Sequence, residues 1–222
     1  MKITIILIAI LVPLTVFLRQ YSLNKLLDEL YRLAYVKNDE KGFLLQLSSL
    51  QADMLMSSKS RKMMELNYWV YKDNATQVKK TADLMEKQRL NAEDAVALYS
   101  LLIGYYANKK DKQGLGYLEK LNKYSSMAKQ ANQQVLINDC NLVCDIYLNN
   151  NIQLIPKIEE IISEEIDKEA KSVYQYRLAY LYKVNGDIQK CKSCLMGAME
   201  NTSKESSKIK IKKILDGGCK AL

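Results

Sequence analysis

Apolar residues between positions 24 and 215 recur at the three- and four-residue spacing of an amphipathic α-helix. Residues 26–36 and 43–50 show the pattern most simply, with Leu26, Leu27, Leu30, Leu33 and Ala34 in the first, and Phe43, Leu44, Leu47 and Leu50 in the second. No segment alternates apolar and polar residues with period 2 between turn signals. The pattern therefore predicts an all-α fold.

Short polar breaks separate the predicted helices at five places. They lie at 37–41, 72–74, 108–112, 149–151 and 185–187, and each is rich in Asn, Asp, Gly or Lys. The residue that closes the first helix of each pair can be set at Ala34, Val70, Tyr105, Tyr147 and Tyr182, so the spacings are 36, 35, 42 and 35 residues. A two-helix unit that repeats at this length is typical of a helical-hairpin solenoid.

The clearest unit, residues 174–200, resembles the tetratricopeptide repeat. Leu178, Ala179 and Tyr182 match the large-small-Tyr set of the family's first helix, Gly186 and Asp187 match its turn, Cys191 stands at a small-residue position, and Leu195 and Ala198 match the second helix. Residues 98–121 are similar. The units near 63–85 and 140–162 depart from the pattern at Asn67 and at Pro156, which fits only the first turn of a helix.

The resemblance covers residues 24–200 and implies a right-handed α-α superhelix of about five hairpins, although other αα-hairpin arrays remain open. We expect the array to occupy residues 21–202. A basic capping helix and tail follow at 203–222, with Ile209, Ile211 and Ile214 on the helix and Gly217 and Gly218 at its end.

The resemblance also implies a concave face lined by the first helix of each unit. Carried over position by position, this face holds Tyr35, Tyr68, Tyr71, Tyr99, Tyr106, Asn141, Tyr176, Tyr180 and Lys183. Tyrosine combines a rigid apolar ring with a hydroxyl group and is enriched where proteins hold peptides. The set predicts a groove for a protein or peptide ligand, although half-exposed helical faces also accept tyrosine without binding anything.

The N-terminal residues form a separate apolar segment. Residues 3–18 carry no charge and are flanked by Lys2 and Arg19, which predicts a transmembrane anchor at 1–20. A cleaved signal sequence is the alternative, but residues 14–22 offer no small-x-small cleavage site. The anchor would make the chain a single-pass protein of the cell membrane. Lysines and arginines after residue 18 favour a cytoplasmic over an extracytoplasmic domain.

Composition narrows the possible chemistry. The 222 residues include no histidine, which excludes Ser-His-Asp and Cys-His catalytic pairs and histidine metal ligands. The net charge of +8 is concentrated at the ends, since residues 201–222 hold six lysines against Glu205 and Asp216. The helical array itself is close to neutral, so we expect no nucleic-acid partner.

Cysteines offer a candidate chemical motif. Cys191 and Cys194 form a Cys-x-x-Cys sequence, and Cys140 and Cys144 lie one turn apart on another predicted helix. The helical context favours packing over redox chemistry, and convergence of all four on a metal ion is not expected, so we predict no cofactor and no metal.

Together these features predict a membrane-anchored, non-catalytic adaptor. The alternatives are a thiol redox or metal-binding protein that uses Cys191 and Cys194, and a structural oligomer of an envelope complex. The sequence leaves the oligomeric state open.

Overall fold

The protein is all-helical throughout the residues that the structure describes. The computed structural model describes residues 2–128 and 130–222, with side chains from residue 15 onward, and shows no strand among them. The chain divides into two compact units, Met1–Asp94 and Ala95–Leu222. The boundary between them lies in the first turn of α6 (Ala92–Asn108).

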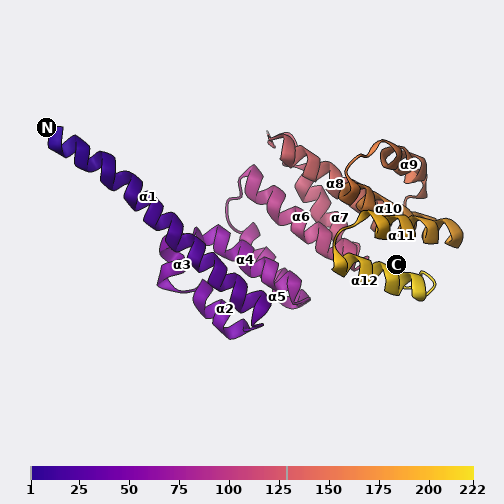
Figure 1. The fold of residues 1–222 in the computed structure, drawn as a ribbon, viewed down its shortest axis with the longest axis horizontal. Coiled ribbons are helices and arrows are strands. Elements are labelled where there is room, and N and C mark those ends of the chain that lie inside the picture. The colour runs from indigo at the N-terminus through magenta and orange to yellow at the C-terminus, as the bar shows by residue number, and fades with distance from the viewer. Residues whose placement is uncertain (1, 129) are drawn as a thin grey trace. The chain divides into compact units, whose positions relative to one another are not determined.

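The first unit contains α1 to α5 (Figure 1). Helix α1 (Lys2–Tyr31) continues into a short π-helix at Arg32–Val36, and α2 (Glu40–Leu47), α3 (Leu50–Leu55), α4 (Ser58–Tyr71) and α5 (Ala75–Glu86) follow. Leu30, Phe43 and Leu66 are buried in its core, where Phe43 stacks on Tyr68 with ring centroids 4.5 Å apart.

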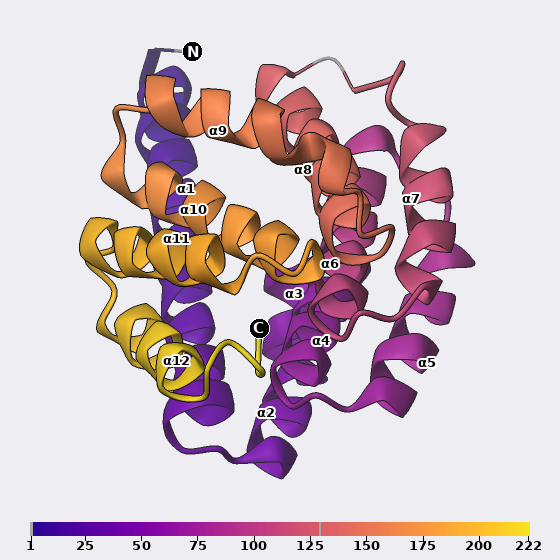
Figure 2. The ribbon, with the colours of Figure 1, turned by 90° about the vertical axis from the view of Figure 1, so that its right-hand side faces the viewer.

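The second unit begins with α6, α7 (Gln113–Asn122) and α8 (Ala131–Tyr147). It continues through a 3₁₀ turn at Ile152–Leu154 to α9 (Ile155–Glu164), α10 (Lys168–Val184), α11 (Ile188–Asn201) and α12 (Glu205–Asp216). Figures 1 and 2 both show α10 and α11 side by side, with α12 next to them. Leu178, Leu195 and Ile214 pack together in the core of these three helices.

Helices break at all five predicted turns, and the turns share one local structure. Each contains a residue with positive φ, at Asn38, Asp73, Lys110, Asn150 and Gly186, so their spacings run from 35 to 40 residues. The next residue in each turn is Asp or Asn, and its side chain accepts a hydrogen bond from a backbone N–H two or three residues on. A left-handed residue ends one helix and an Asn or Asp side chain begins the next.

Two local predictions are confirmed and one is refined. Pro156 lies in the first turn of α9, and the basic C-terminal helix is present as α12, which ends at Gly217. Ile211 and Ile214 of α12 are buried, whereas Ile209 is 50% exposed because its alternation with Ile211 places it on the outer face.

The predicted single-pass membrane location is wrong. Among the residues that the structure describes, no helix is both long enough and apolar enough to cross a membrane. The part of α1 whose side chains are described carries Arg19, Lys25, Asp28 and Glu29, and charges at this density are costly in hydrocarbon. The side chains of residues 2–14 lie outside the described part, as does residue 1. These side chains make up most of the membrane contact that the sequence predicts at 3–18.

Candidate functional site

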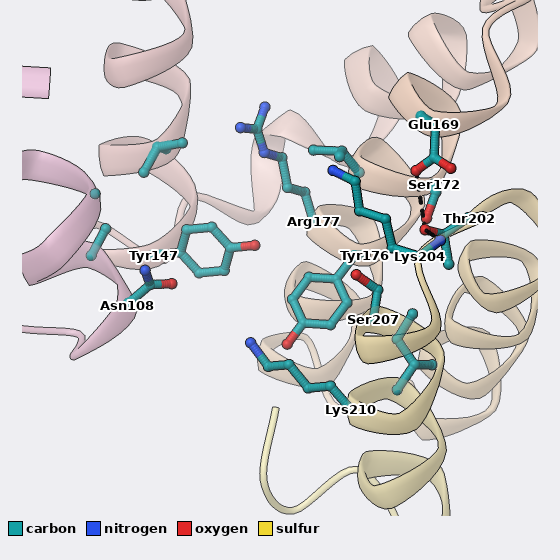
Figure 3. Close-up of a pocket in the computed structure, with 15 residues that line it drawn as sticks. Asn108, Tyr147, Glu169, Ser172, Tyr176, Arg177, Thr202, Lys204, Ser207 and Lys210 are labelled. Atoms are coloured by element: carbon teal, nitrogen blue, oxygen red, sulfur yellow. Dashed lines mark hydrogen bonds between the residues drawn. The ribbon is translucent and has the colours of Figure 1, made fainter. Parts of the chain in front are cut away.

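A cleft of about 380 Å³ in the second unit is the candidate functional site. Its walls come from α6, α8, α10, α12 and the short connection between α11 and α12 (Figure 3). Val143, Ala107 and Ile211 give it apolar surface, and lysine and tyrosine side chains give it polar groups. We call it the α10–α12 cleft.

Helix α10 supplies the central wall of the cleft. Glu169, Ser172, Tyr176 and Arg177 are spaced by three, four and one residues, so they fall along one stripe of the helix. The opposite stripe of α10, with Leu178 and other apolar residues, packs into the core. An amphipathic helix thus presents its polar stripe to the cleft and its apolar stripe to the core.

Hydrogen bonds hold the connection between α11 and α12 in place. The Thr202 hydroxyl donates to Glu169 at 3.0 Å, and the backbone N–H of Ser203 also donates to that carboxylate. The hydrogen bonds from Ser203, with a smaller contribution from Thr202, lower the pKa of the Glu169 carboxyl. These contacts set the position from which Lys204 reaches into the cleft (Figure 3).

Arg177 is buried and its charge is compensated. Its guanidinium group donates to both carboxylate oxygens of Asp139, at 2.6 and 2.9 Å, and lies 5.5 Å from the centroid of the Tyr174 ring. A bidentate pair of this kind fixes the orientation of both groups. Arg177 therefore braces α10 against α8 as well as lining the cleft.

Two tyrosines and one lysine face the cleft from different helices. Tyr147 comes from α8 and Tyr176 from α10, and burial raises the pKa of both phenols, which keeps them protonated. Lys210 of α12 places its ammonium group 5.5 Å from the centroid of the Tyr176 ring, within the range of a cation–π interaction. Figure 3 shows the Tyr176 hydroxyl directed toward Lys210.

No family model, no curated protein and no solved structure matches this chain.

Only one of the nine predicted groove residues, Tyr176, lines this cleft. Tyr99, Tyr106 and Tyr180 are 4–5% exposed and lie within the second unit, so little of their rings can meet a partner. Tyr106 stacks on Tyr117, and the Tyr180 hydroxyl donates to Asn150. In this fold these side chains therefore pack between helices.

Asn141 and Lys183 are engaged in contacts within the second unit. Asn141 donates to the carbonyl oxygen of Ile137 at 2.9 Å. Lys183 donates to the backbone oxygens of Lys220 and Leu222 at 2.9 and 2.7 Å. Both side chains therefore support local structure.

Tyr35, Tyr68 and Tyr71 belong to the first unit. Tyr68 is fully buried against Phe43. Tyr35 and Tyr71 lie together, with ring centroids 4.8 Å apart, and Tyr71 is 56% exposed. This pair retains the exposed aromatic surface that the sequence predicts, while the binding role of all nine residues stays a prediction.

Sequence reasoning missed Tyr147, Glu169, Arg177, Lys204 and Lys210 as members of a site. The spacing of Glu169, Ser172 and Tyr176 on one predicted helix was an available signal. No local sequence pattern predicts that Tyr147 or Lys210 belongs to the site, because they reach the cleft from other helices.

The cysteines are all free thiols. Cys191 is fully buried and Cys194 is half-buried. Burial raises the pKa of Cys194 to about 11 and that of Cys191 to about 12, the opposite of the lowered pKa that activates a thiol. Among the described residues, no group of three or more Cys, Asp or Glu side chains could hold a metal ion.

Proposed function

We propose that this chain is a non-catalytic binding protein that holds an acidic segment of a partner protein in the α10–α12 cleft. The observation that carries the proposal is the cleft itself, whose volume of about 380 Å³ falls in the range of ligand sites. Its apolar walls could receive a side chain of the partner, and its polar groups could orient the partner's backbone and charges.

Charge favours an acidic ligand. Arg177, Lys204 and Lys210 line the cleft against the single carboxylate of Glu169. Asp139 already compensates Arg177, and Glu169 is engaged by the connection at 202–203. Lys204 and Lys210 therefore supply the positive charge that an incoming carboxylate would meet.

The pKa shifts of the ionisable groups in the cleft support binding rather than proton transfer. General acid–base catalysis near neutral pH needs a group whose pKa lies near 7. Here burial raises the pKa of Tyr147 and Tyr176, and hydrogen bonds lower that of Glu169. All three groups are moved away from neutrality.

The repeated turns support a tetratricopeptide-like architecture as part of the same proposal. Five helix–turn–helix units share a left-handed residue followed by an Asn or Asp cap, at spacings of 35 to 40 residues. Arrays of this kind commonly bind peptides on surfaces formed by successive helices.

A peptide-binding measurement on the full chain tests the proposal. The probe is a fluorescein-labelled octapeptide of Asp, Glu and Phe, followed by fluorescence anisotropy. Lys210→Glu should weaken binding at least tenfold, because it places a carboxylate beside the ligand. Lys212→Glu is the matched control, since Lys212 is exposed on the same helix and lies outside the cleft; it should change binding less than twofold.

Two results would overturn the proposed function. One is the absence of octapeptide binding to the unaltered chain. The other is equal weakening by Lys210→Glu and Lys212→Glu, which would show that net charge rather than the cleft captures the peptide.

A further inference from the structure

The connection between α9 and α10 combines three carboxylates with one exposed apolar side chain. We call residues 164–167 the acidic loop, which consists of Glu164, Glu165, Ile166 and Asp167. Ile166 is 93% exposed, more than any other large apolar side chain that the structure describes. A lone apolar residue on a surface is ordinary, but here it lies between carboxylates on a well-ordered loop.

Hydrogen bonds hold the acidic loop in one conformation. The N–H of Glu165 donates to the carbonyl oxygen of Ile161 at 2.9 Å and closes the last turn of α9. The N–H of Asp167 donates to the Glu165 carboxylate at 3.0 Å. The Asp167 carboxylate accepts a hydrogen bond from the N–H of Ala170 at 2.7 Å and caps the start of α10. A loop that is ordered in advance loses little conformational entropy when a partner encloses Ile166.

The α10–α12 cleft has the chemistry that complements this loop. Its apolar surface includes Val143 and Ile211, and Lys204 and Lys210 give it positive charge. Its volume of about 380 Å³ is ample for one branched aliphatic side chain. The loop does not fill the cleft of its own chain, since Ile166 is exposed and residues 164–167 are not among those that line the cleft. A loop of this kind therefore comes to the cleft from another molecule.

We propose that the partner in the α10–α12 cleft is a second copy of this chain, whose acidic loop inserts Ile166 between the apolar walls and sets its carboxylates beside Lys204 and Lys210. The inference rests on the proposed function, because it names the ligand of the same cleft. Charge complementarity selects this partner and orients it, and burial of Ile166 adds the apolar contribution.

The loop and the cleft adjoin at one end of α10, which favours a twofold dimer. Glu169 lines the cleft and follows Ile166 by only three residues. When two copies meet at this end about a twofold axis, each loop enters the cleft of the other copy. The same contact then forms twice, and association closes at two chains.

Sedimentation equilibrium of the full chain tests the dimer. We expect the mean mass to rise from one chain to two with increasing concentration, and Ile166→Ser should raise the dissociation constant about tenfold or more. Lys210→Glu should raise it by a similar factor, because it places a carboxylate beside the incoming loop. Ile188→Ser is the matched control, since Ile188 is 42% exposed on α11 and lies outside the cleft; it should change the dissociation constant less than twofold.

A mixture of the two weakened variants locates the contact. Lys210→Glu keeps the acidic loop and impairs the cleft, whereas Ile166→Ser keeps the cleft and impairs the loop. A mixed pair retains one intact loop–cleft contact, and each variant alone retains none. The equimolar mixture should therefore associate more tightly than either variant alone. Circular dichroism establishes that each variant is folded, and Ile166→Ala replaces Ile166→Ser if the latter is not.

Three results would overturn the inference. They are a monomeric unaltered chain at about 0.5 mM, equal effects of Ile166→Ser and Ile188→Ser, and a mixture that associates no more tightly than its components.

Octapeptide binding separates this inference from the proposed function. Ile166 lies outside the cleft, so Ile166→Ser should bind the acidic octapeptide at least as tightly as the unaltered chain. Octapeptide binding without dimers refutes the second copy and leaves the proposed function standing. If Ile166→Ser and Lys210→Glu both weaken the dimer but the octapeptide does not bind, the loop contact stands and the general capture of acidic segments fails.

Discussion

At the scale of single residues, burial sets the chemistry of the thiols. Cys194 is half-buried on α11, and desolvation, reinforced by Glu159, raises its pKa from 9.0 to about 11. The raised pKa means that the folded chain favours the neutral thiol. This preference stabilises the fold below pH 9 and is lost as pH rises through 11.

The alkylation rate of Cys194 should report this shift. At pH 8 a pKa of about 11 leaves roughly a hundredfold less thiolate than a pKa of 9.0, so iodoacetamide should modify Cys194 about a hundredfold more slowly in the folded chain than in urea. The rate should rise about tenfold per pH unit up to pH 10. Mass spectrometry of the modified peptide gives the rate, and a folded rate within threefold of the unfolded one would contradict the assigned environment.

At the scale of helices, close packing against α7 depends on a glycine, Gly114, which has no side chain. A Cβ atom at Gly114 would lie 2.8 Å from Leu148 Cδ1 and 3.3 Å from Tyr106 Cβ. A Cβ atom added at Gly116, one half-turn along the same helix, would meet open space. Leu148 and Tyr106 therefore approach α7 at Gly114 more closely than any larger residue at that position would allow.

Alanine substitutions at these two glycines should have opposite effects. Gly114→Ala should lower the free energy of unfolding by about 1–3 kcal/mol, because Leu148 and Tyr106 must move to admit the methyl group. Gly116→Ala should raise it by up to about 1 kcal/mol through helix propensity alone. Urea unfolding of both variants gives the comparison, and equal changes would show that α7 does not pack as described.

At the scale of the whole molecule, positive charge is unevenly distributed. The chain carries a net charge of +8, and Lys204, Lys208, Lys210, Lys212, Lys213 and Lys220 lie on or beside α12. Most of them are exposed, and Lys204 and Lys210 line the cleft. A charge field of this kind acts mainly on the rate at which an acidic ligand arrives.

Salt should therefore weaken octapeptide binding through association. Between 0.05 and 0.3 M NaCl we expect the association rate constant to fall roughly fivefold or more while dissociation changes little. Stopped-flow anisotropy measures both rates. A lysine octapeptide should show no binding at either salt concentration, and a salt-independent association rate for the acidic probe would argue against electrostatic capture.

Local sequence patterns do not report contacts between distant parts of the chain. For this reason they did not predict the α10–α12 cleft, and they gave a wrong prediction of membrane location at the N-terminus. The apolar run at 3–18 resembles a membrane span when considered alone, whereas the part of α1 whose side chains are described carries Arg19, Lys25, Asp28 and Glu29. The repeat resemblance assigns Tyr99 and Tyr106 to an exposed groove, yet each is only 5% exposed.

The sequence by itself determined the helices, the five turns and the C-terminal helix. Helical periodicity, left-handed turn residues such as Gly186 and caps such as Asp187 act within a few residues of the chain. Only the tertiary structure decided which polar residues share a cleft and which tyrosines are buried. Those contacts join segments up to about a hundred residues apart, and they depend on how the helices pack, which no local pattern encodes.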